Sequence, residues 1–157
     1  ELYQVQKFET KISNLLLLII LKLIIIQIIL GAFLSGLDGG LIYNTWPDMN
    51  GNFFPDDVNL NDITNSQLFN NVSIIQFLHR FTAYFLLFFI IILNYYFFKK
   101  GNEIKFILFF DLAILIQIFL GVVTLVSGVE IKYASLHQLG SILVLSSYLL
   151  LFYKNPN

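Results

Sequence analysis

The sequence predicts an all-α membrane protein that folds as a bundle of four transmembrane helices. Two observations carry this prediction. The 157 residues are 57% hydrophobic and only 12% charged, which is too apolar for a soluble domain of this length. In addition, four apolar runs are long enough to cross a bilayer as helices, which takes about 20 residues. These runs cover residues 13–37, 74–98, 104–126 and 131–153.

The rest of the composition narrows the class of protein. The net charge is −1, so nothing indicates binding to nucleic acid. The lack of cysteine excludes disulfides, iron–sulfur clusters and thiolate ligation of a heme. We therefore expect one transmembrane domain over residues 1–157, surrounded by lipid. Because the chain opens at Glu1 and its only methionine is Met49, we also expect it to be the C-terminal part of a longer protein that lacks the N-terminal half.

The first span is followed by a long loop. Span 13–37 is too long, and too poorly flanked, to be the apolar part of a signal peptide. Glycines at its end let the backbone turn tightly, and Pro47 forbids a further helix. Tyr43 and Trp46 are typical of a membrane interface. Residues 38–73 are therefore expected to form a loop at the membrane surface.

The charges predict the orientation of the bundle. The positive-inside rule makes the side with most lysines cytoplasmic or matrix-facing, so both termini lie inside and the loop lies outside. The membrane is then a bacterial plasma membrane or a mitochondrial inner membrane. The inner cations are Lys7, Lys11, Lys99, Lys100, Lys105 and Lys154, and the outer side has Arg80 and Lys132 against Asp38, Asp48, Asp56, Asp57, Asp62 and Glu130.

The only two histidines lie at matched depth in the second and fourth spans, which run in the same direction. His79 and His137 each lie about 8 Å below the outer boundary at the helical rise. Imidazole is costly in hydrocarbon unless something holds it, so an intramembrane histidine indicates a functional site. Two histidines at one level suggest a heme iron that both ligate. The alternative is that each simply hydrogen-bonds a neighbouring helix.

Residues on the same helix faces suit a porphyrin. Gly140 and Ser141 follow His137 on one face, where small residues leave room for a flat macrocycle or for close approach of two helices. Gln76 shares the face of His79. Together with one cation at the rim, these residues form the predicted cofactor site. Its members are His79, His137, Arg80, Gln76, Gly140 and Ser141.

The outer rim leaves two interpretations open. Arg80 and Lys132 either pair with the propionates of a heme or extend to the interface as ordinary cations. Asp38 and Asn44 either contact the heme edge or a partner, or cap the end of the first helix.

Other polar residues lie inside the first and third spans. Lys22 and Asp111 are at similar depth, and we expect them to form an ion pair, because an unpaired charge in the bilayer is costly. The alternatives are that Lys22 extends to the inner surface alone and that Asp111 relays protons. Gln117 and Thr124 share a face with Gly121, which favours hydrogen bonds between helices around a close-packing glycine over direct contact with a heme.

The motifs, taken in order, resemble the C-terminal half of heme A synthase. They are residues 31–51, 76–80, 117–125 and 137–138, and they cover all four spans. That family consists of two pseudo-symmetric four-helix halves, so the resemblance implies that this chain is one half of an eight-helix protein. Each half carries a histidine pair on its second and fourth helices. The family oxidises the C8 methyl of heme O to the formyl group of heme A, which serves terminal cytochrome oxidases.

Position 76 distinguishes the two halves. The N-terminal, substrate-handling half of the family has a glutamate, implicated in catalysis, three residues before its first histidine. Gln76 stands there in this chain, and a glutamine cannot act as a carboxylate base. The resemblance therefore implies that His79 and His137 ligate heme b and that the chain passes electrons to or from the catalytic half. It places no catalytic residue in these 157 residues.

The resemblance also implies partners. They are heme O, reached through the other half, heme O synthase, cytochrome oxidase assembly proteins, and an electron acceptor that the sequence does not identify. Alone, the chain is not expected to make heme A. Two other interpretations are a stand-alone bis-histidine b-type cytochrome that exchanges electrons with quinol, and a heme-free assembly protein whose histidines only join helices.

Overall fold

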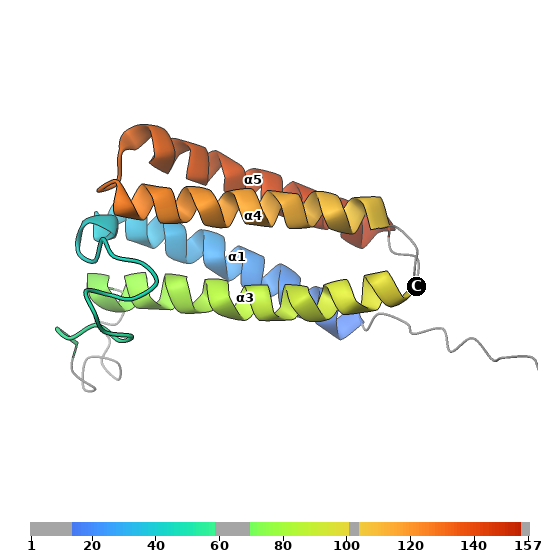
Figure 1. The fold of residues 1–157 in the computed structure, drawn as a ribbon, viewed down its shortest axis with the longest axis horizontal. Helices are drawn as coiled ribbons and strands as arrows, with labels where there is room; N and C mark the ends of the chain where they lie inside the picture. Colours follow the sequence, from blue (N-terminus) through green and yellow to red (C-terminus); the bar gives the residue numbers. More distant parts are fainter. Residues whose placement is uncertain (1–13, 59–69, 101–103, 155–157) are drawn as a thin grey trace, which may run out of the picture.

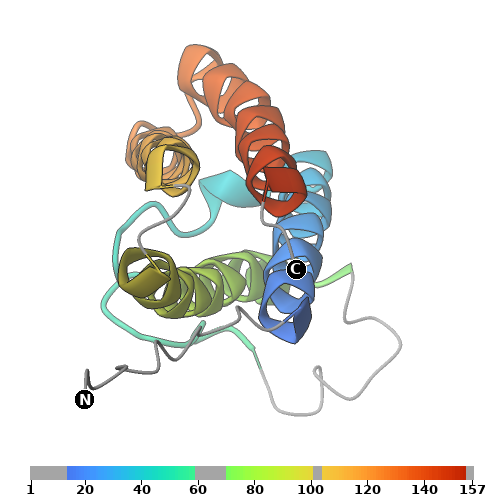
Figure 2. The same cartoon turned by 90° about the vertical axis from the view of Figure 1, so that its right-hand side faces the viewer.

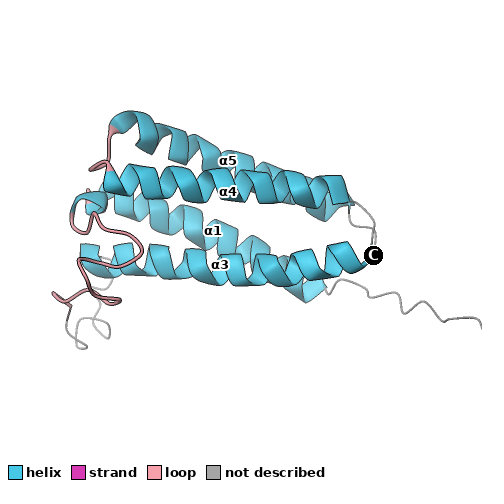
Figure 3. Cartoon of the chain, viewed as in Figure 1, coloured by secondary structure: helices cyan, strands magenta, loops and turns pink. Residues whose placement is uncertain are grey.

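A computed structural model describes residues 14–58, 70–100 and 104–154. Its four long helices are α1 (Asn14–Gly36), α3 (Val72–Lys100), α4 (Ile104–Val126) and α5 (Ile131–Lys154), and a short 3-10 helix, η1 (Gly39–Leu41), follows α1 (Figure 1). Each long helix has the length and composition to cross a membrane. The described residues form no strand (Figure 3). The predicted four-helix fold is confirmed, and each predicted span matches its helix to within two residues.

The four helices form two pairs. α1 packs along α3 and α4 packs along α5, whereas the contacts between the pairs, α1 with α5 and α3 with α4, are much less extensive (Figure 2). The loop after α1 and the turn between α4 and α5 lie at one end of the bundle, which we call the loop end (Figure 1). We call the opposite end, where Lys99, Lys105 and Lys154 lie, the lysine end.

The main hydrophobic core lies toward the lysine end and joins all four helices. Tyr148 of α5 is fully buried in it, and its hydroxyl donates a 2.5 Å hydrogen bond to the carbonyl oxygen of Leu17 in α1. The ring of Phe110 lies 5.2 Å from that of Tyr148. The buried members of the core are Leu16, Leu17, Ile20, Ile24, Leu86, Ile90, Leu93, Phe97, Ile107, Phe110, Ala113, Ile114, Val144, Tyr148 and Leu151.

The core shows that the second helix pair repeats the first. Three buried positions of α1 match buried positions of α4 that lie 90 residues later, and three of α3 match buried positions of α5 that lie 58 residues later. Equivalent positions are therefore buried in both pairs, as expected for a pseudo-twofold axis along the bundle. The matched positions are Leu17, Ile20 and Ile24 with Ile107, Phe110 and Ile114, and Leu86, Ile90 and Leu93 with Val144, Tyr148 and Leu151.

The expected ion pair between Lys22 and Asp111 is wrong. The carboxylate of Asp111 accepts a 2.9 Å hydrogen bond from Nδ2 of Asn94 in α3. Lys22 is exposed on α1, and the described residues give it no ion pair. The physical reason is the pairing of the helices: α4 packs on α5 and meets α3, so Asp111 faces the polar side chain that α3 offers.

Candidate functional site

His79 lies near the loop end of α3, with its ring against α1. A Cβ atom added to Gly31 of α1 would stand 3.2 Å from Cε1 of the ring, so the glycine gives the imidazole room to lie against the helix. The Nε2 atom of His79 lies 3.3 Å from Nε2 of Gln27, one turn earlier in α1. The other ring nitrogen, Nδ1, is buried without a hydrogen-bond partner among the described residues.

His137 lies in the same way against the other helix pair. A Cβ atom at Gly121 of α4 would stand 2.9 Å from Cε1 of its ring. The Nδ1 atom of His137 lies 3.1 Å from the carbonyl oxygen of Gln117, and Nε2 of Gln117 donates a 2.9 Å hydrogen bond to the carbonyl oxygen of His137. Within the described part of the chain, Nδ1 is the ring atom that makes the hydrogen bond.

We call each pair of a glutamine and a glycine that contacts a histidine ring a histidine seat. Gln27 and Gly31 form the first seat, and Gln117 and Gly121 form the second one 90 positions later. Both lie in a segment Gln-Ile-x-Leu-Gly, at 27–31 and 117–121. Neither Gln27 nor the contact of Gly31 with the ring was predicted from the sequence. The repeated segment is the signal that finds them.

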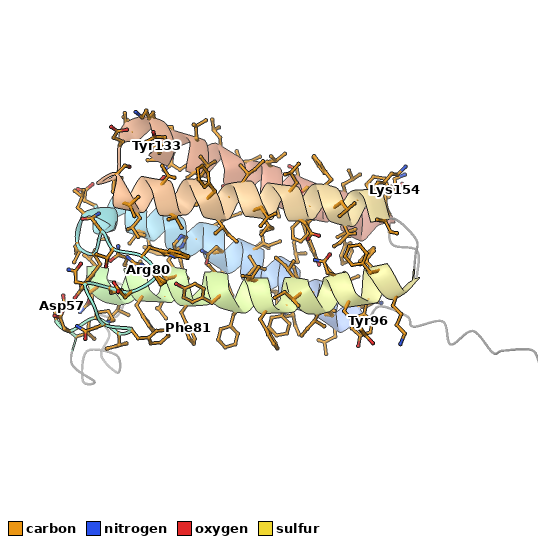
Figure 4. The ribbon with its side chains drawn as sticks, viewed as in Figure 1. Asp57, Arg80, Phe81, Tyr96, Tyr133 and Lys154 are labelled. Atoms are coloured by element: carbon orange, nitrogen blue, oxygen red, sulfur yellow. The ribbon has the colours of Figure 1, made fainter. Side chains whose placement is uncertain are left out.

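Two of the predicted site residues hold the loop. Nη1 of Arg80 donates hydrogen bonds to the carbonyl oxygens of Thr45, at 3.0 Å, and Asp48, at 2.7 Å. Its Nη2 donates to the carbonyl oxygen of Tyr43 at 2.8 Å, and Nε2 of Gln76 donates to the same oxygen at 2.9 Å. Arg80 points from α3 into the loop (Figure 4). Arg80 and Gln76 therefore fix the loop above His79.

A second anchor of the loop is a buried tyrosine beside two carboxylates. The hydroxyl of Tyr43 lies 2.8 Å from Oδ1 of Asp56 and 2.8 Å from Oδ1 of Asp57, and Ser73 donates a 2.6 Å hydrogen bond to Asp57. Burial, together with the two carboxylates, raises the pKa of Tyr43. Burial alone would raise the pKa of Asp57, but the hydrogen bonds from Ser73 and Tyr43 outweigh it and lower the pKa. The loop is thus tied to the start of α3 by an ionised carboxylate.

The two small residues after His137 have different roles. A Cβ atom at Gly140 would overlap Oε1 of Gln117, so this glycine permits close approach of α4 and α5, which was one of its two predicted roles. The hydroxyl of Ser141 donates to a carbonyl oxygen of its own helix at 2.6 Å. Gln117 joins two helices as predicted. The same prediction for Thr124 is wrong, because its hydroxyl donates to the carbonyl oxygen of Leu120 in its own helix.

At the outer rim, the polar residues contact protein groups. Lys132 pairs with Glu130 at 2.8 Å on the surface. Nδ2 of Asn44 donates to a carbonyl oxygen of η1 at 2.7 Å and to that of Leu125 in α4 at 3.0 Å, so Asn44 ties the loop to the second helix pair. The side chain of Asp38 makes no capping hydrogen bond.

Residues 4–149 match the COX15-CtaA family of cytochrome oxidase assembly proteins. The chain belongs to this family. It is 71% identical over 157 residues to the heme A synthase of Pelagibacter ubique (strain HTCC1062), covering 100% of this chain and 47% of that protein. It is 39% identical over 152 residues to the heme A synthase of Wolbachia pipientis wMel, covering 94% of this chain and 42% of that protein.

A third relative is the heme A synthase of Rickettsia bellii (strain OSU 85-389), 40% identical over 130 residues, which make up 80% of this chain and 38% of that protein. The chain therefore spans about half the length, or less, of the curated COX15-CtaA relatives that it matches. No solved structure matches it.

Membership of the COX15-CtaA family implies a heme, and the described residues fit one. Nδ1 of His137 lies on the carbonyl oxygen of Gln117, and its Nε2 has no hydrogen-bond partner among the described residues, which is the arrangement that an axial ligand requires. His79 lies on the equivalent seat of the other helix pair. The described residues hold no group of three or more histidine, cysteine, aspartate or glutamate side chains that could bind a metal ion by themselves. A porphyrin supplies four ligands to its own iron, so a heme needs only two histidines from the protein.

Buried polar atoms without hydrogen-bond partners also gather around the two histidines. Of the five that the described residues contain, four belong to residues around the two histidines, and the hydrophobic core stops short of them. Such atoms are costly in an apolar surrounding and usually mark a functional site or a bound group. They are Gln27 Oε1, Gln76 Oε1, His79 Nδ1 and Gln117 Oε1.

Proposed function

We propose that this chain is the heme b-binding, electron-transferring half of a heme A synthase. The whole enzyme would convert heme O to heme A by oxidising the C8 methyl to a formyl group. The observation that carries the proposal is the pair of histidine seats: His79 and His137 each lie on an equivalent Gln–Gly pair of the neighbouring helix, with one ring nitrogen without a protein partner among the described residues. The relatives named heme A synthase support the same assignment.

In this proposal His79 and His137 are the axial ligands of heme b. Bound heme b would carry one electron at a time by cycling between ferric and ferrous iron. The protein holds the two imidazoles, excludes water by the surrounding apolar helices, and covers the site with the loop that Arg80 and Gln76 fix. Gly140 lies at the α4–α5 seam and sets the spacing of the two helices, and Ser141 follows it in α5.

Gln76 has a holding role rather than a catalytic one. Its Nε2 donates to the carbonyl oxygen of Tyr43, and an amide cannot take up a proton as a carboxylate base does. We therefore assign the oxidation of heme O to the half that this chain does not contain, and propose that the chain alone makes no heme A. Detection of a formyl heme after supplying heme O and reductant to the purified chain would contradict this assignment.

For the orientation, we propose that the lysine end faces the cytoplasm or the mitochondrial matrix and the loop end faces the opposite side. The electron partner would then approach the histidines from the loop side, where they lie closest to the surface. Heme O synthase and cytochrome oxidase assembly proteins are the proposed partners of the whole enzyme.

The test is a reduced-minus-oxidised absorption spectrum with pyridine hemochrome analysis of the full chain, of His79→Ala and of His137→Ala. We expect a low-spin b-type spectrum at about one heme per chain, which either substitution abolishes or turns high-spin. A chain that is folded and takes up no hemin on reconstitution would overturn the proposal and favour a heme-free assembly protein. A bound heme that remains low-spin in both variants would overturn the ligand assignment.

A further inference from the structure

We infer that the carboxyl group of Asp111 is a proton-binding site inside the membrane. At neutral pH it is a neutral carboxylic acid, and it forms two reciprocal hydrogen bonds with the side-chain amide of Asn94. Neither residue takes part in the proposed heme site, so this proton site does not depend on the proposed function. Where the sequence predicted an ion pair, two neutral groups join the helices.

Asp111 lies in an apolar part of its helix. It is seven residues after Ile104, the first residue of α4, which places it about 10 Å from the lysine end of that helix. The five residues on each side of it are all apolar. Its side chain is half-buried and meets α3 through Asn94. An ionised carboxylate at such a position is costly unless a cation or several donors compensate its charge.

The described residues offer Asp111 no cation. They form a single ion pair, which joins Lys132 and Glu130 at the other end of the bundle. No tyrosine of α3 or α5 donates to Asp111 among the described residues, and the buried one, Tyr148, donates to the carbonyl oxygen of Leu17. The lysines of the four helices toward this end are all exposed; they are Lys22 of α1, Lys99 of α3, Lys105 of α4 and Lys154 of α5.

The orientation of the Asn94 amide follows from its own helix. Nδ2 of Asn94 donates to the carbonyl oxygen of Ile90 at 3.1 Å and to Oδ1 of Asp111 at 2.9 Å. A carbonyl oxygen can only accept a hydrogen bond, so the atom that faces Ile90 is the amide nitrogen. Oδ1 of Asn94 is then left buried without a hydrogen-bond partner among the described residues.

A proton on Asp111 compensates for both deficits. It removes the charge from the apolar surroundings, which is how a carboxyl group without a cation usually adapts to burial. It also turns the second carboxyl oxygen into a donor, and the unpaired Oδ1 of Asn94 belongs to the same planar amide as the nitrogen that already reaches Asp111. The two groups therefore close a ring of two hydrogen bonds between α3 and α4, where the helix pairs otherwise have few contacts.

The experiment is infrared spectroscopy of the full chain at pH 7, purified in a detergent without ester or carboxyl groups. The C=O stretch of a protonated carboxylic acid is absent from an ionised carboxylate and moves to lower frequency in D₂O. The chain has 10 aspartates and glutamates. With ordinary pKa values, each is protonated in about one or two molecules in a thousand at pH 7. A band that corresponds to about one carboxylic acid per chain is therefore about a hundredfold more than all of them would give together.

We expect this band in the original chain and its loss in Asp111→Asn, which keeps the shape of the side chain. Asp38→Asn is the control, because Asp38 lies in the loop without a capping hydrogen bond, and it should retain the band. A chain without the band at pH 7, or a band that survives in Asp111→Asn, would overturn the inference.

The reciprocal pairing has its own test. Asn94→Leu removes the donor to the carboxyl oxygen, so the C=O band of Asp111 should move to higher frequency. Ser147→Ala is the matched control, because it also removes a buried polar group but one that bonds only within α5, and it should leave the band in place. A band at the same frequency in Asn94→Leu as in the original chain would overturn the pairing of Asp111 with Asn94.

Discussion

Gly31 lies against the imidazole of His79, and a Cβ atom on this glycine would stand 3.2 Å from Cε1 of the ring. Gly121 has the same relation to His137 at 2.9 Å. Both glycines lie inside helices, where alanine is otherwise the better helix former. Their value is therefore the space that they leave for the rings and not a local backbone conformation.

The first prediction follows from this space. Gly31→Ala and Gly121→Ala should each push the histidine ring away by a few tenths of an ångström and weaken hemin binding about tenfold or more, with the larger loss at Gly121 where the contact is closer. The measurement is a hemin titration followed by absorption. Gly36→Ala is the control, because Gly36 has open space around it and should retain its affinity. Equal affinity in all three variants would contradict the prediction.

The second prediction concerns the hold of Arg80 on the loop. Arg80→Leu removes three hydrogen bonds from a charged group, each worth about 1.5–3 kcal/mol. Amide hydrogen exchange over residues 43–48 should then rise at least tenfold, since about 1.4 kcal/mol corresponds to a factor of ten. Lys132→Leu removes a cation that pairs only with the exposed Glu130 and should leave this exchange unchanged. If both variants gave the same exchange as the original chain, Arg80 would not hold the loop.

The third prediction concerns the core. Tyr148→Phe removes the hydrogen bond from α5 to the carbonyl oxygen of Leu17 in α1 and leaves the packing of the ring intact. The free energy of unfolding should fall by about 0.5–1.5 kcal/mol, as measured by denaturation in detergent. Tyr153, in the same helix, is 80% exposed, so Tyr153→Phe should have no measurable effect. A loss in Tyr153→Phe equal to that in Tyr148→Phe would show that the interhelix bond contributes nothing.

The fourth prediction is a pH dependence of the loop. The pKa of Asp57 lies below its ordinary value of 3.8, because the hydrogen bonds from Ser73 and Tyr43 outweigh burial. A lowered pKa in the folded state means that the ionised carboxylate stabilises the loop at neutral pH, fully so above the ordinary value. That stabilisation is lost as the pH falls through the lowered pKa.

The only tryptophan of the chain, Trp46, lies in this loop and reports on it. Its fluorescence should stay constant from neutral pH down to about the ordinary aspartate value and change below it. Asp57→Asn should weaken this acid transition. Asp38→Asn is the control, because the side chain of Asp38 makes no capping hydrogen bond, and it should leave the transition in place. An acid transition of equal size in Asp57→Asn would assign it to another group.

The spans could be predicted from the sequence because they depend on position along one helix. Long apolar runs fix where a helix enters and leaves a bilayer, so the bounds of α4 were predicted to the residue. Depth is a property of each helix by itself and requires no knowledge of its neighbours.

The contacts between neighbouring helices, and between the helices and the loop, could not be predicted in the same way. These helices are apolar on every side, so the sequence gives no face that must point inward. The ion pair expected between Lys22 and Asp111 was therefore wrong, because Asp111 meets Asn94 of α3. Arg80 was expected near a ligand or the interface, and its loop contacts depend on the path of a loop that no periodic pattern describes.

The position of the core has a consequence for how this protein is made. All four helices meet in the core at the lysine end, and none of its buried members belongs to a histidine seat. Under the proposed function, association of the helices would therefore not depend on the cofactor, because the core contains no residue that would hold it.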